Sequence, residues 1–324
     1  MLRPATRNKL SDLTGWHCYA PTIPTPAVAF GESNGISPLP AGSICNRGGS
    51  MTYCVGIKLD AGLVFLSDSR TNAGLDQIST FRKMMVYERP SDRFMVMLSA
   101  GNLSISQSVR EILQVEKLDN GSNAPLTIWN ATSMFEAVRV LGSAVRRVYD
   151  QDGPSLKASG VEFNASMIFG GQIGNEAMRL FLVYSAGNFI EATRETCYFQ
   201  AGESKYGKPV LDRMITPSTP LDEAAKCGLV SMDSTLKSNL SVGLPLDLLV
   251  YEANALQSGQ IVCVDEQNPY FQMIRGTWGQ RLRQVFESIE DPQWKGGETQ
   301  HPLCVTSARY EPMRKITHPG EKII

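Results

Sequence analysis

Residues 51–60 read MTYCVGIKLD, and they have the character of the start of a folded protein although fifty residues precede them. Removal of a methionine requires a small second residue, so a Thr that directly follows Met51 can become a free amino terminus. An amino-terminal Thr52 combines a hydroxyl nucleophile with an α-amine that can take the hydroxyl proton. Such an amine titrates at about pH 8 in an unperturbed chain, so much of it is neutral at physiological pH. We therefore interpret the chain as organised around exposing and tuning Thr52.

The bulk composition is that of a globular protein. The chain has 324 residues, a formal net charge of -1 and 42% hydrophobic residues, enough for one large domain or two small ones. A net charge near zero gives no electrostatic reason to expect nucleic acid or an anionic membrane as a partner. The sequence contains no run of eighteen apolar residues and no apolar core near its start, so neither a membrane span nor a secretory signal is expected.

The cysteines and histidines limit the kinds of metal site, redox motif and catalytic base that the chain can have. The seven cysteines form no CxxC pair, which argues against a zinc ribbon or a thioredoxin motif, and we expect no cofactor. Their odd number and wide spacing are typical of reduced thiols in a cytoplasm. The three histidines are His17, His301 and His318, so the main body of the chain has none. If the protein is a hydrolase, its general base is therefore not a histidine.

The first fifty residues differ from the rest. They hold six of the chain's 18 prolines and lack a sustained apolar period, so we expect residues 1–51 to form a disordered extension. It is either a propeptide whose removal exposes Thr52 or an over-extended gene start with Met51 as the true initiator. The run Arg47-Gly48-Gly49-Ser50 favours the second explanation, because a purine-rich ribosome-binding site translates into Arg and Gly codons.

Regular elements are expected from residue 52 onward. The hairpin 52–59 and 63–68, a polar loop 71–80, the strands 83–88 and 94–99 and the helices 103–118 and 129–149 come first. The strands 164–170, 178–185 and 189–193, the helices 206–214 and 221–236, the strands 247–251 and 260–265 and the helix 278–287 follow. The order of strands, two helices, strands, two helices and strands predicts an α+β fold with two antiparallel sheets between helix layers.

A free Thr52 needs neighbours that tune it. A buried lysine keeps an amine neutral and a hydroxyl acidic through its positive charge, and a carboxylate holds that lysine charged. Asp68 ends the second strand, and a hairpin returns the chain beside its start, so Asp68 is expected near Thr52. Lys83 opens the third strand. Alone, Asp68 is better explained as a turn cap and Lys83 as a solvated strand end, but together at these strand positions they are specific.

These residues resemble a known family. Thr52, the strand end Ser67-Asp68-Ser69-Arg70, Arg82-Lys83 and Ser99-Ala100-Gly101 are similar to the catalytic pattern of proteasome β-type subunits, in particular the bacterial ancestral β-subunit family, Anbu. The phrases MTYCVGIKLDAG, SDSRTNAGLDQISTFRKM and SNLSVGLPLDLLVYE carry the resemblance. It runs from Met51 to at least Tyr251 and does not include residues 1–50.

The resemblance implies a four-layer αββα amino-terminal-nucleophile hydrolase fold over residues 52–300, followed by an irregular tail over 301–324. It implies that Thr52 is the nucleophile with its own amine as base, that Asp68 and Lys83 tune it, and that the Gly101 N–H stabilises the oxyanion. Ser241 matches the serine of the proteasome Asp-x-x-Ser-Gly element. The sequence departs there, because Ser238 replaces the Asp and Val242 replaces the Gly.

The segment Gly202-Glu203-Ser204-Lys205-Tyr206-Gly207-Lys208-Pro209 has a second interpretation. It nearly fits the phosphate loop GxxxxGK[ST], but Pro209 stands where the Mg²⁺-binding hydroxyl belongs. In the resembled family this segment borders the active-site cleft, and Ser204 falls near a serine that assists catalysis. We favour the cleft over the nucleotide site.

The expected activity is that of a cytoplasmic threonine peptidase or amidase. The resemblance implies a peptide or unfolded protein as substrate, a homo-oligomer in a ring or open-ring assembly, and room for an ATP-driven unfoldase as partner. The alternative is a catalytically silent scaffold of the same fold, since Ser238 replaces the family's Asp. The apolar residues Trp278, Leu282, Val285 and Phe286 suit either the core or a subunit interface.

Overall fold

The structure is a computed structural model that describes residues 52–72, 78–119, 121 and 124–291, so the expected extension 1–51 and the end of the chain from 292 lie outside the described residues. One antiparallel sheet has the order β10-β1-β2-β11-β12, with β1 at Tyr53–Leu59, β2 at Gly62–Asp68, β10 at Tyr198–Gly202, β11 at Leu246–Glu252 and β12 at Gln260–Val264. A second has the order β5-β6-β7-β8-β9, with β5 at Met84–Arg89, β6 at Arg93–Gly101, β7 at Ala165–Ile173, β8 at Arg179–Val183 and β9 at Phe189–Glu191.

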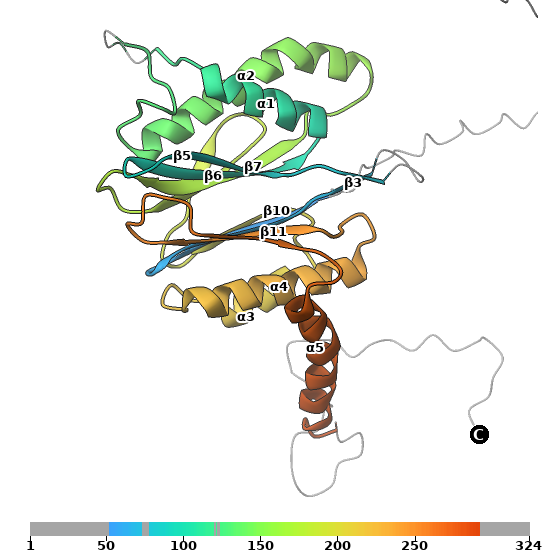
Figure 1. Ribbon diagram of the computed structural model, residues 1–324. Helices are drawn as coiled ribbons and strands as arrows, with labels where there is room; N and C mark the ends of the chain where they lie inside the picture. The colour runs from blue at the N-terminus through green and yellow to red at the C-terminus, as the bar shows by residue number, and fades with distance from the viewer. Residues whose placement is uncertain (1–51, 73–77, 120, 122–123, 292–324) are drawn as a thin grey trace, which may run out of the picture. The chain divides into compact units, whose positions relative to one another are not determined.

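Helices cover the outer face of each sheet (Figure 1). Helices α1 (Leu103–Val115) and α2 (Met134–Ala158) lie on the second sheet, and α3 (Lys208–Met214) and α4 (Leu221–Ser238) lie on the first. Helix α5 (Pro269–Glu287) packs against α4 with its first turns and then extends away from it. This arrangement confirms the predicted αββα sandwich.

Three apolar clusters hold the four layers together. One joins α1 and α2 to the second sheet, one joins α3, α4 and the start of α5 to the first sheet, and one lies between the two sheets. In the cluster between the sheets the rings of Phe94 and Tyr251 stack with centroids 4.5 Å apart. Gly56 allows the close approach there, since a Cβ at this position would lie 2.7 Å from Ile168 Cγ2. Strands buried on both faces explain the continuous apolar runs of β1 and β2.

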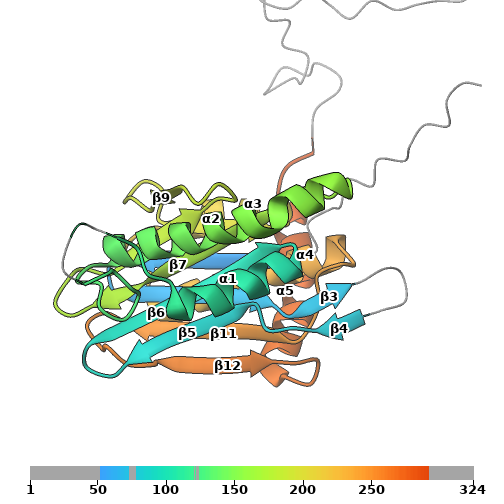
Figure 2. The same ribbon diagram turned by 90° about the horizontal axis from the view of Figure 1, so that it is seen from above.

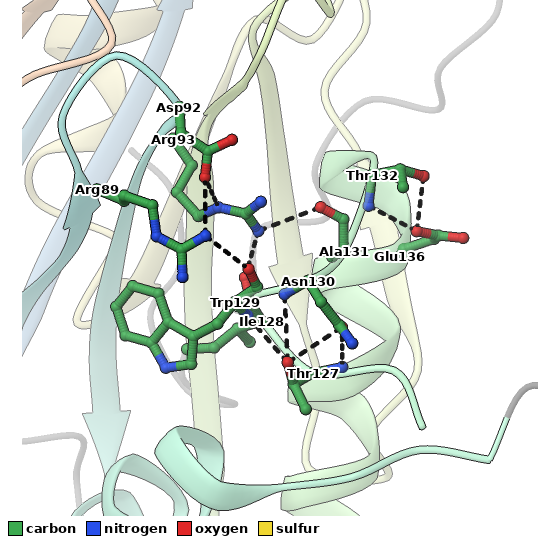
Figure 3. A network of polar contacts seen from close by, with 10 residues as sticks. All are labelled: Arg89, Asp92, Arg93, Thr127, Ile128, Trp129, Asn130, Ala131, Thr132 and Glu136. Atoms are coloured by element: carbon green, nitrogen blue, oxygen red, sulfur yellow. Dashed lines mark hydrogen bonds and ion pairs between the residues drawn. The ribbon is translucent and has the colours of Figure 1, made fainter. Parts of the chain in front are cut away.

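A polar network fixes the segment that enters α2 (Figure 3). The guanidinium of Arg93, at the start of β6, donates to the carbonyls of Ile128 at 2.8 Å and Ala131 at 3.1 Å. Ser133 then caps the helix by accepting from the N–H of Glu136, whose carboxylate accepts from the N–H of Thr132 at 2.8 Å. These contacts explain why α2 begins at Met134 rather than at the predicted residue 129.

Several boundaries differ from those predicted. The expected loop 71–80 contains two short paired strands, β3 (Arg70–Asn72) and β4 (Ile78–Thr80), which Figure 2 shows side by side. Lys83 directly precedes β5 rather than opening it. Helix α5 begins at Pro269, nine residues before the predicted start at 278, because Asn268 caps it by accepting from the Phe271 N–H. None of the helices within the described residues is long and apolar enough to span a membrane.

Candidate active site

An ion pair is buried where β1, β2 and β5 meet. The Lys83 ammonium lies 2.7 Å from Asp68 Oδ1 and also donates to the carbonyl of Arg70 at 2.6 Å. The exposed fractions of the two side chains are 5% for Lys83 and 0% for Asp68. An ion pair so fully removed from water needs further hydrogen bonds to offset its desolvation. The backbone supplies them, since Asp68 accepts from the N–H of Tyr53 at 3.0 Å and of Gly243 at 3.4 Å.

The hairpin register places Asp68 at the start of β1. Cys54 pairs with Ser67 and Val55 with Leu66, so the residue after Ser67 lies beside the residues that precede Cys54. The hydrogen bond from Tyr53 N–H to Asp68 therefore fixes the carboxylate one residue from Thr52. The structure thus places the Asp68–Lys83 pair beside the residue that follows Thr52, and the position of Asp68 near the start of β1 is the one expected from the hairpin.

Burial dominates the electrostatics of this cluster. It raises the pKa of the Asp68 carboxyl above its ordinary value, while the Lys83 ammonium and the N–H groups of Tyr53 and Gly243 act in the opposite direction. Burial likewise raises the pKa of the Cys54 thiol. Cys54 is therefore a neutral thiol, which makes it an unsuitable nucleophile beside Thr52.

Thr52 itself is buried, with only 5% of its surface exposed. Its carbonyl accepts a hydrogen bond from the N–H of Glu203 at 2.7 Å, just beyond the end of β10. Strand β10 pairs with β1 through Tyr53 and Gly202, so Thr52 lies between the end of β10 on one side and the end of β2 on the other. A backbone hydrogen bond thus fixes Thr52 on the β10 side, and the hydrogen bond from Tyr53 N–H to Asp68 fixes the next residue on the β2 side.

Gly101 ends β6 with a φ of 105°, a conformation that favours glycine. A Cβ at this position would lie 2.4 Å from the carbonyl oxygen of Asn164, so a side chain is also sterically excluded. The N–H of Ser99, two residues earlier, donates to the carbonyl of Lys83 at 3.0 Å. This contact ties the end of β6, and with it Gly101, to the strand end that carries Lys83.

Ser241 belongs to a second polar cluster in the loop between α4 and β11. Its hydroxyl donates to Asn239 Oδ1 at 2.5 Å, and the Asn239 Nδ2 group donates to Glu203 Oε2 at 3.1 Å. Ser238 is exposed at the end of α4. Sequence reasoning missed Glu203 and Asn239, although both stand next to residues that it singled out.

Ser204 and Lys208 lie in the segment that nearly fits a phosphate loop. The backbone carbonyl of Ser204 accepts a hydrogen bond from the N–H of Lys208 at 3.0 Å, at the start of α3. The Lys208 ammonium forms an ion pair with Asp212 at 2.8 Å, one turn along the same helix. Within the described residues no group of three or more His, Cys, Asp or Glu side chains is placed to hold a metal ion.

Comparison with known proteins shows the family of this chain. No family model and no curated protein matches the chain. Among solved structures, Anbu (ancestral β-subunit) from Yersinia bercovieri is 48% identical with a TM-score of 0.68, and the match covers 75% of this chain and 100% of that chain. The chain belongs to the Anbu family.

Two further Anbu structures match over the same share of the chain. A Gly-1 mutant from Hyphomicrobium sp. strain MC1 is 43% identical, with 75% of this chain and 99% of that chain covered and a TM-score of 0.68. Anbu from Pseudomonas aeruginosa, solved as a helical assembly of the Anbu complex, is 45% identical, with 75% and 98% covered and a TM-score of 0.68. The αββα sandwich of this chain is thus the Anbu, proteasome-like fold.

Proposed function

We propose that this Anbu chain is a threonine-type amidohydrolase that cleaves peptide bonds with Thr52 as its amino-terminal nucleophile. The buried Asp68–Lys83 pair, held beside Tyr53 N–H, is the observation that carries the proposal. A cation at this place opposes a second positive charge on the Thr52 amine and stabilises negative charge on its hydroxyl oxygen. It therefore favours the neutral base and the activated nucleophile that the reaction needs.

The reaction proceeds through an acyl-enzyme. The Thr52 hydroxyl oxygen attacks the peptide carbonyl while the α-amine of Thr52 takes the hydroxyl proton. The Gly101 N–H donates to the resulting oxyanion, and collapse of the intermediate passes the proton to the leaving amine. Water, deprotonated by the same α-amine, then hydrolyses the Thr52 ester. In this scheme Asp68 and Lys83 tune the nucleophile, and we assign Ser204 and Ser241 supporting roles because of their resemblance to serines of the proteasome pattern.

The proposal requires that Thr52 becomes the first residue. The Yersinia bercovieri chain is covered completely by 75% of this chain, so a quarter of this chain has no counterpart in it. This coverage supports the loss of residues 1–51, either by processing or because synthesis starts at Met51.

We further propose that the protein acts as a homo-oligomer on peptides or unfolded proteins in the cytoplasm, with an ATP-driven unfoldase as a possible partner. The helical assembly of the Pseudomonas aeruginosa relative and the exposed apolar residues on the outer half of α5 support self-association. The free thiols of Cys54, Cys197, Cys227 and Cys263 suit a reducing compartment.

The first experiment is the intact mass and amino-terminal sequence of the protein from its own host, followed by reaction with a peptide β-lactone. The expected result is a chain that begins at Thr52 and carries one acyl group on that residue. Thr52→Ala should remove both acylation and peptide hydrolysis and leave the assembly intact. Unchanged turnover in Thr52→Ala contradicts the proposal.

A catalytically silent scaffold is the second candidate function. Ser238 in place of the Asp of the resembled motif favours it, as does Met51, which blocks the Thr52 amine in the chain as written. Retention of Met1 or Met51 in the mature protein, together with no acylation by the β-lactone, is the result that this candidate predicts.

A further inference from the structure

Three residues, Glu203, Asn239 and Ser241, form one polar path to Thr52. The N–H of Glu203 binds the Thr52 carbonyl at 2.7 Å, and the Glu203 carboxylate accepts from Asn239 Nδ2 at 3.1 Å. Asn239 Oδ1 in turn accepts from both the N–H of Ser241 at 2.9 Å and the hydroxyl of Ser241 at 2.5 Å. The path begins and ends at the site, because Gly243, two residues after Ser241, donates its N–H to Asp68.

The chemistry of the path fixes the direction of every hydrogen bond. A carboxylate only accepts, so the Asn239 amide must turn its NH₂ group toward Glu203 and its oxygen toward Ser241. The Asn239 amide oxygen is also only an acceptor, so the Ser241 hydroxyl must donate its hydrogen bond to Asn239. The lone pairs of Ser241 Oγ are then left to accept a hydrogen bond from another donor. In a chain that begins at Thr52, the α-amine adds N–H donors on the residue whose carbonyl Glu203 binds.

We propose that Glu203 and Asn239 are positioning residues that fix the Ser241 hydroxyl as an acceptor for the Thr52 α-amine, in place of a carboxylate at position 238. An amine that donates its N–H to Ser241 turns its lone pair away from Ser241, and that orientation leaves the lone pair to the Thr52 hydroxyl. The Glu203 carboxylate also adds a negative charge that favours the ammonium form, opposite in sign to Lys83. The two charges together set the pKa of the amine.

This inference rests on the proposed function for its catalytic meaning but is testable without catalysis. The protein is expressed from Met51, which retains both sheets and all five described helices, and treated with methionine aminopeptidase to free Thr52. The pKa of the Thr52 amine is then measured by competitive labelling with acetic anhydride across pH, read by mass spectrometry of the amino-terminal peptide. Charged groups in contact with the site are Asp68, Arg70, Lys83 and Glu203, and the variants change only the last.

Glu203→Gln should lower the pKa of the Thr52 amine by about half a unit, because a negative charge near the ammonium is lost. The control Glu162→Gln removes the same charge from an exposed position after α2 and should leave that pKa unchanged. An unchanged or raised amine pKa in Glu203→Gln, in a protein whose circular dichroism and thermal midpoint match the parent, overturns the proposal.

Acylation by the peptide β-lactone gives the second readout. Asn239→Leu and Ser241→Ala should each slow acylation about tenfold at saturating probe without weakening probe binding, because orientation rather than affinity is lost. Ser241→Thr keeps the hydroxyl and should retain most of the rate. If the parent is not acylated but the amine titration responds to Glu203→Gln, the proposed function fails and the positioning path stands. If the parent is acylated and both Asn239→Leu and Ser241→Ala react at its rate, the path fails and the function stands.

Discussion

At the scale of single residues, the Asp68–Lys83 pair makes the sharpest energetic prediction. Lys83→Met leaves the Asp68 carboxylate buried without a counter-charge, which should lower the free energy of unfolding by about 3–5 kcal/mol and abolish acylation of Thr52. Chemical denaturation measures the first effect. The control Lys208→Met breaks the exposed pair with Asp212 and should cost at most about 0.5 kcal/mol.

A double variant separates charge from packing at the same pair. Asp68→Asn combined with Lys83→Met removes both buried charges, so it should be less destabilised than the sum of the two single variants. Strict additivity of the three free energies would show that the two side chains do not interact as an ion pair.

The burial of Tyr87 predicts that the stability of the protein depends on pH. Its side chain is buried, its hydroxyl has no hydrogen-bond partner in the part of the chain that the structure describes, and burial raises its pKa to about 12. The unfolded chain loses this proton near pH 10, so its contribution to stability is complete below pH 10 and falls as the pH rises toward 12. Tyr87→Phe should be at least as stable as the parent at neutral pH and should lose less stability between pH 10 and 12. Denaturant titrations of both proteins between pH 10 and 12 test this prediction, and parallel stability curves would contradict it.

At the scale of elements, two helical glycines form a matched pair. A Cβ at Gly142 in α2 would lie 2.3 Å from the carbonyl oxygen of Gly187 in the β8–β9 turn, whereas a Cβ at Gly279 in α5 meets nothing within 4 Å. Gly142→Ala should therefore cost about 1–3 kcal/mol through overpacking. Gly279→Ala should stabilise the protein by about 0.5–1 kcal/mol, because alanine loses less backbone entropy in a helix. Equal thermal midpoints for the two variants would refute the close contact between α2 and this turn.

Most helices and strands could be predicted because turns, caps and apolar periods within each segment determine them. The hairpin β1–β2 followed from two apolar runs around Asp60-Ala61-Gly62, and its register brought Asp68 beside Thr52. The early start of α5 was also encoded, since Asn268-Pro269 is a typical helix entry that the apolar period of the later turns obscured. Strand β10 is short, and the sequence indicated only a β-like run before the segment that starts at Gly202, without its bounds.

The path through Glu203, Asn239 and Ser241 depends on non-local pairing. Glu203 reaches Thr52 because the edge strand β10 pairs with β1, and Asn239, which ends α4, donates to the Glu203 carboxylate. Neither contact follows from spacing in the chain. The resemblance to the proteasome motif marked the position of Ser241 and the missing Asp at 238, but the residues that contact Ser241 come from the three-dimensional arrangement.

At the scale of the whole molecule, the outer half of α5 predicts self-association. Leu282, Val285, Phe286 and Ile289 recur at spacings of three and four, so they line one face of the helix and the turn after it. This face is exposed, with Phe286 74% accessible, whereas the first turns of α5 bury Phe271 and Ile274 against the body. An apolar stripe of this kind on a protein whose Pseudomonas aeruginosa relative was solved as a helical assembly suits a contact with a second copy of the chain.

Phe286→Asp should therefore shift the protein toward smaller species, because it places a charge in the centre of the stripe. Gln284→Asp adds the same charge on the opposite side of the same helix and should leave the assembly unchanged. Analytical ultracentrifugation of both variants and the parent, over a range of concentrations, measures the mass against the 35.6 kDa of one chain. A parent that sediments as one chain at every concentration rules out the assembly. A Phe286→Asp variant that assembles as the parent does would show that the contact between copies lies on another surface.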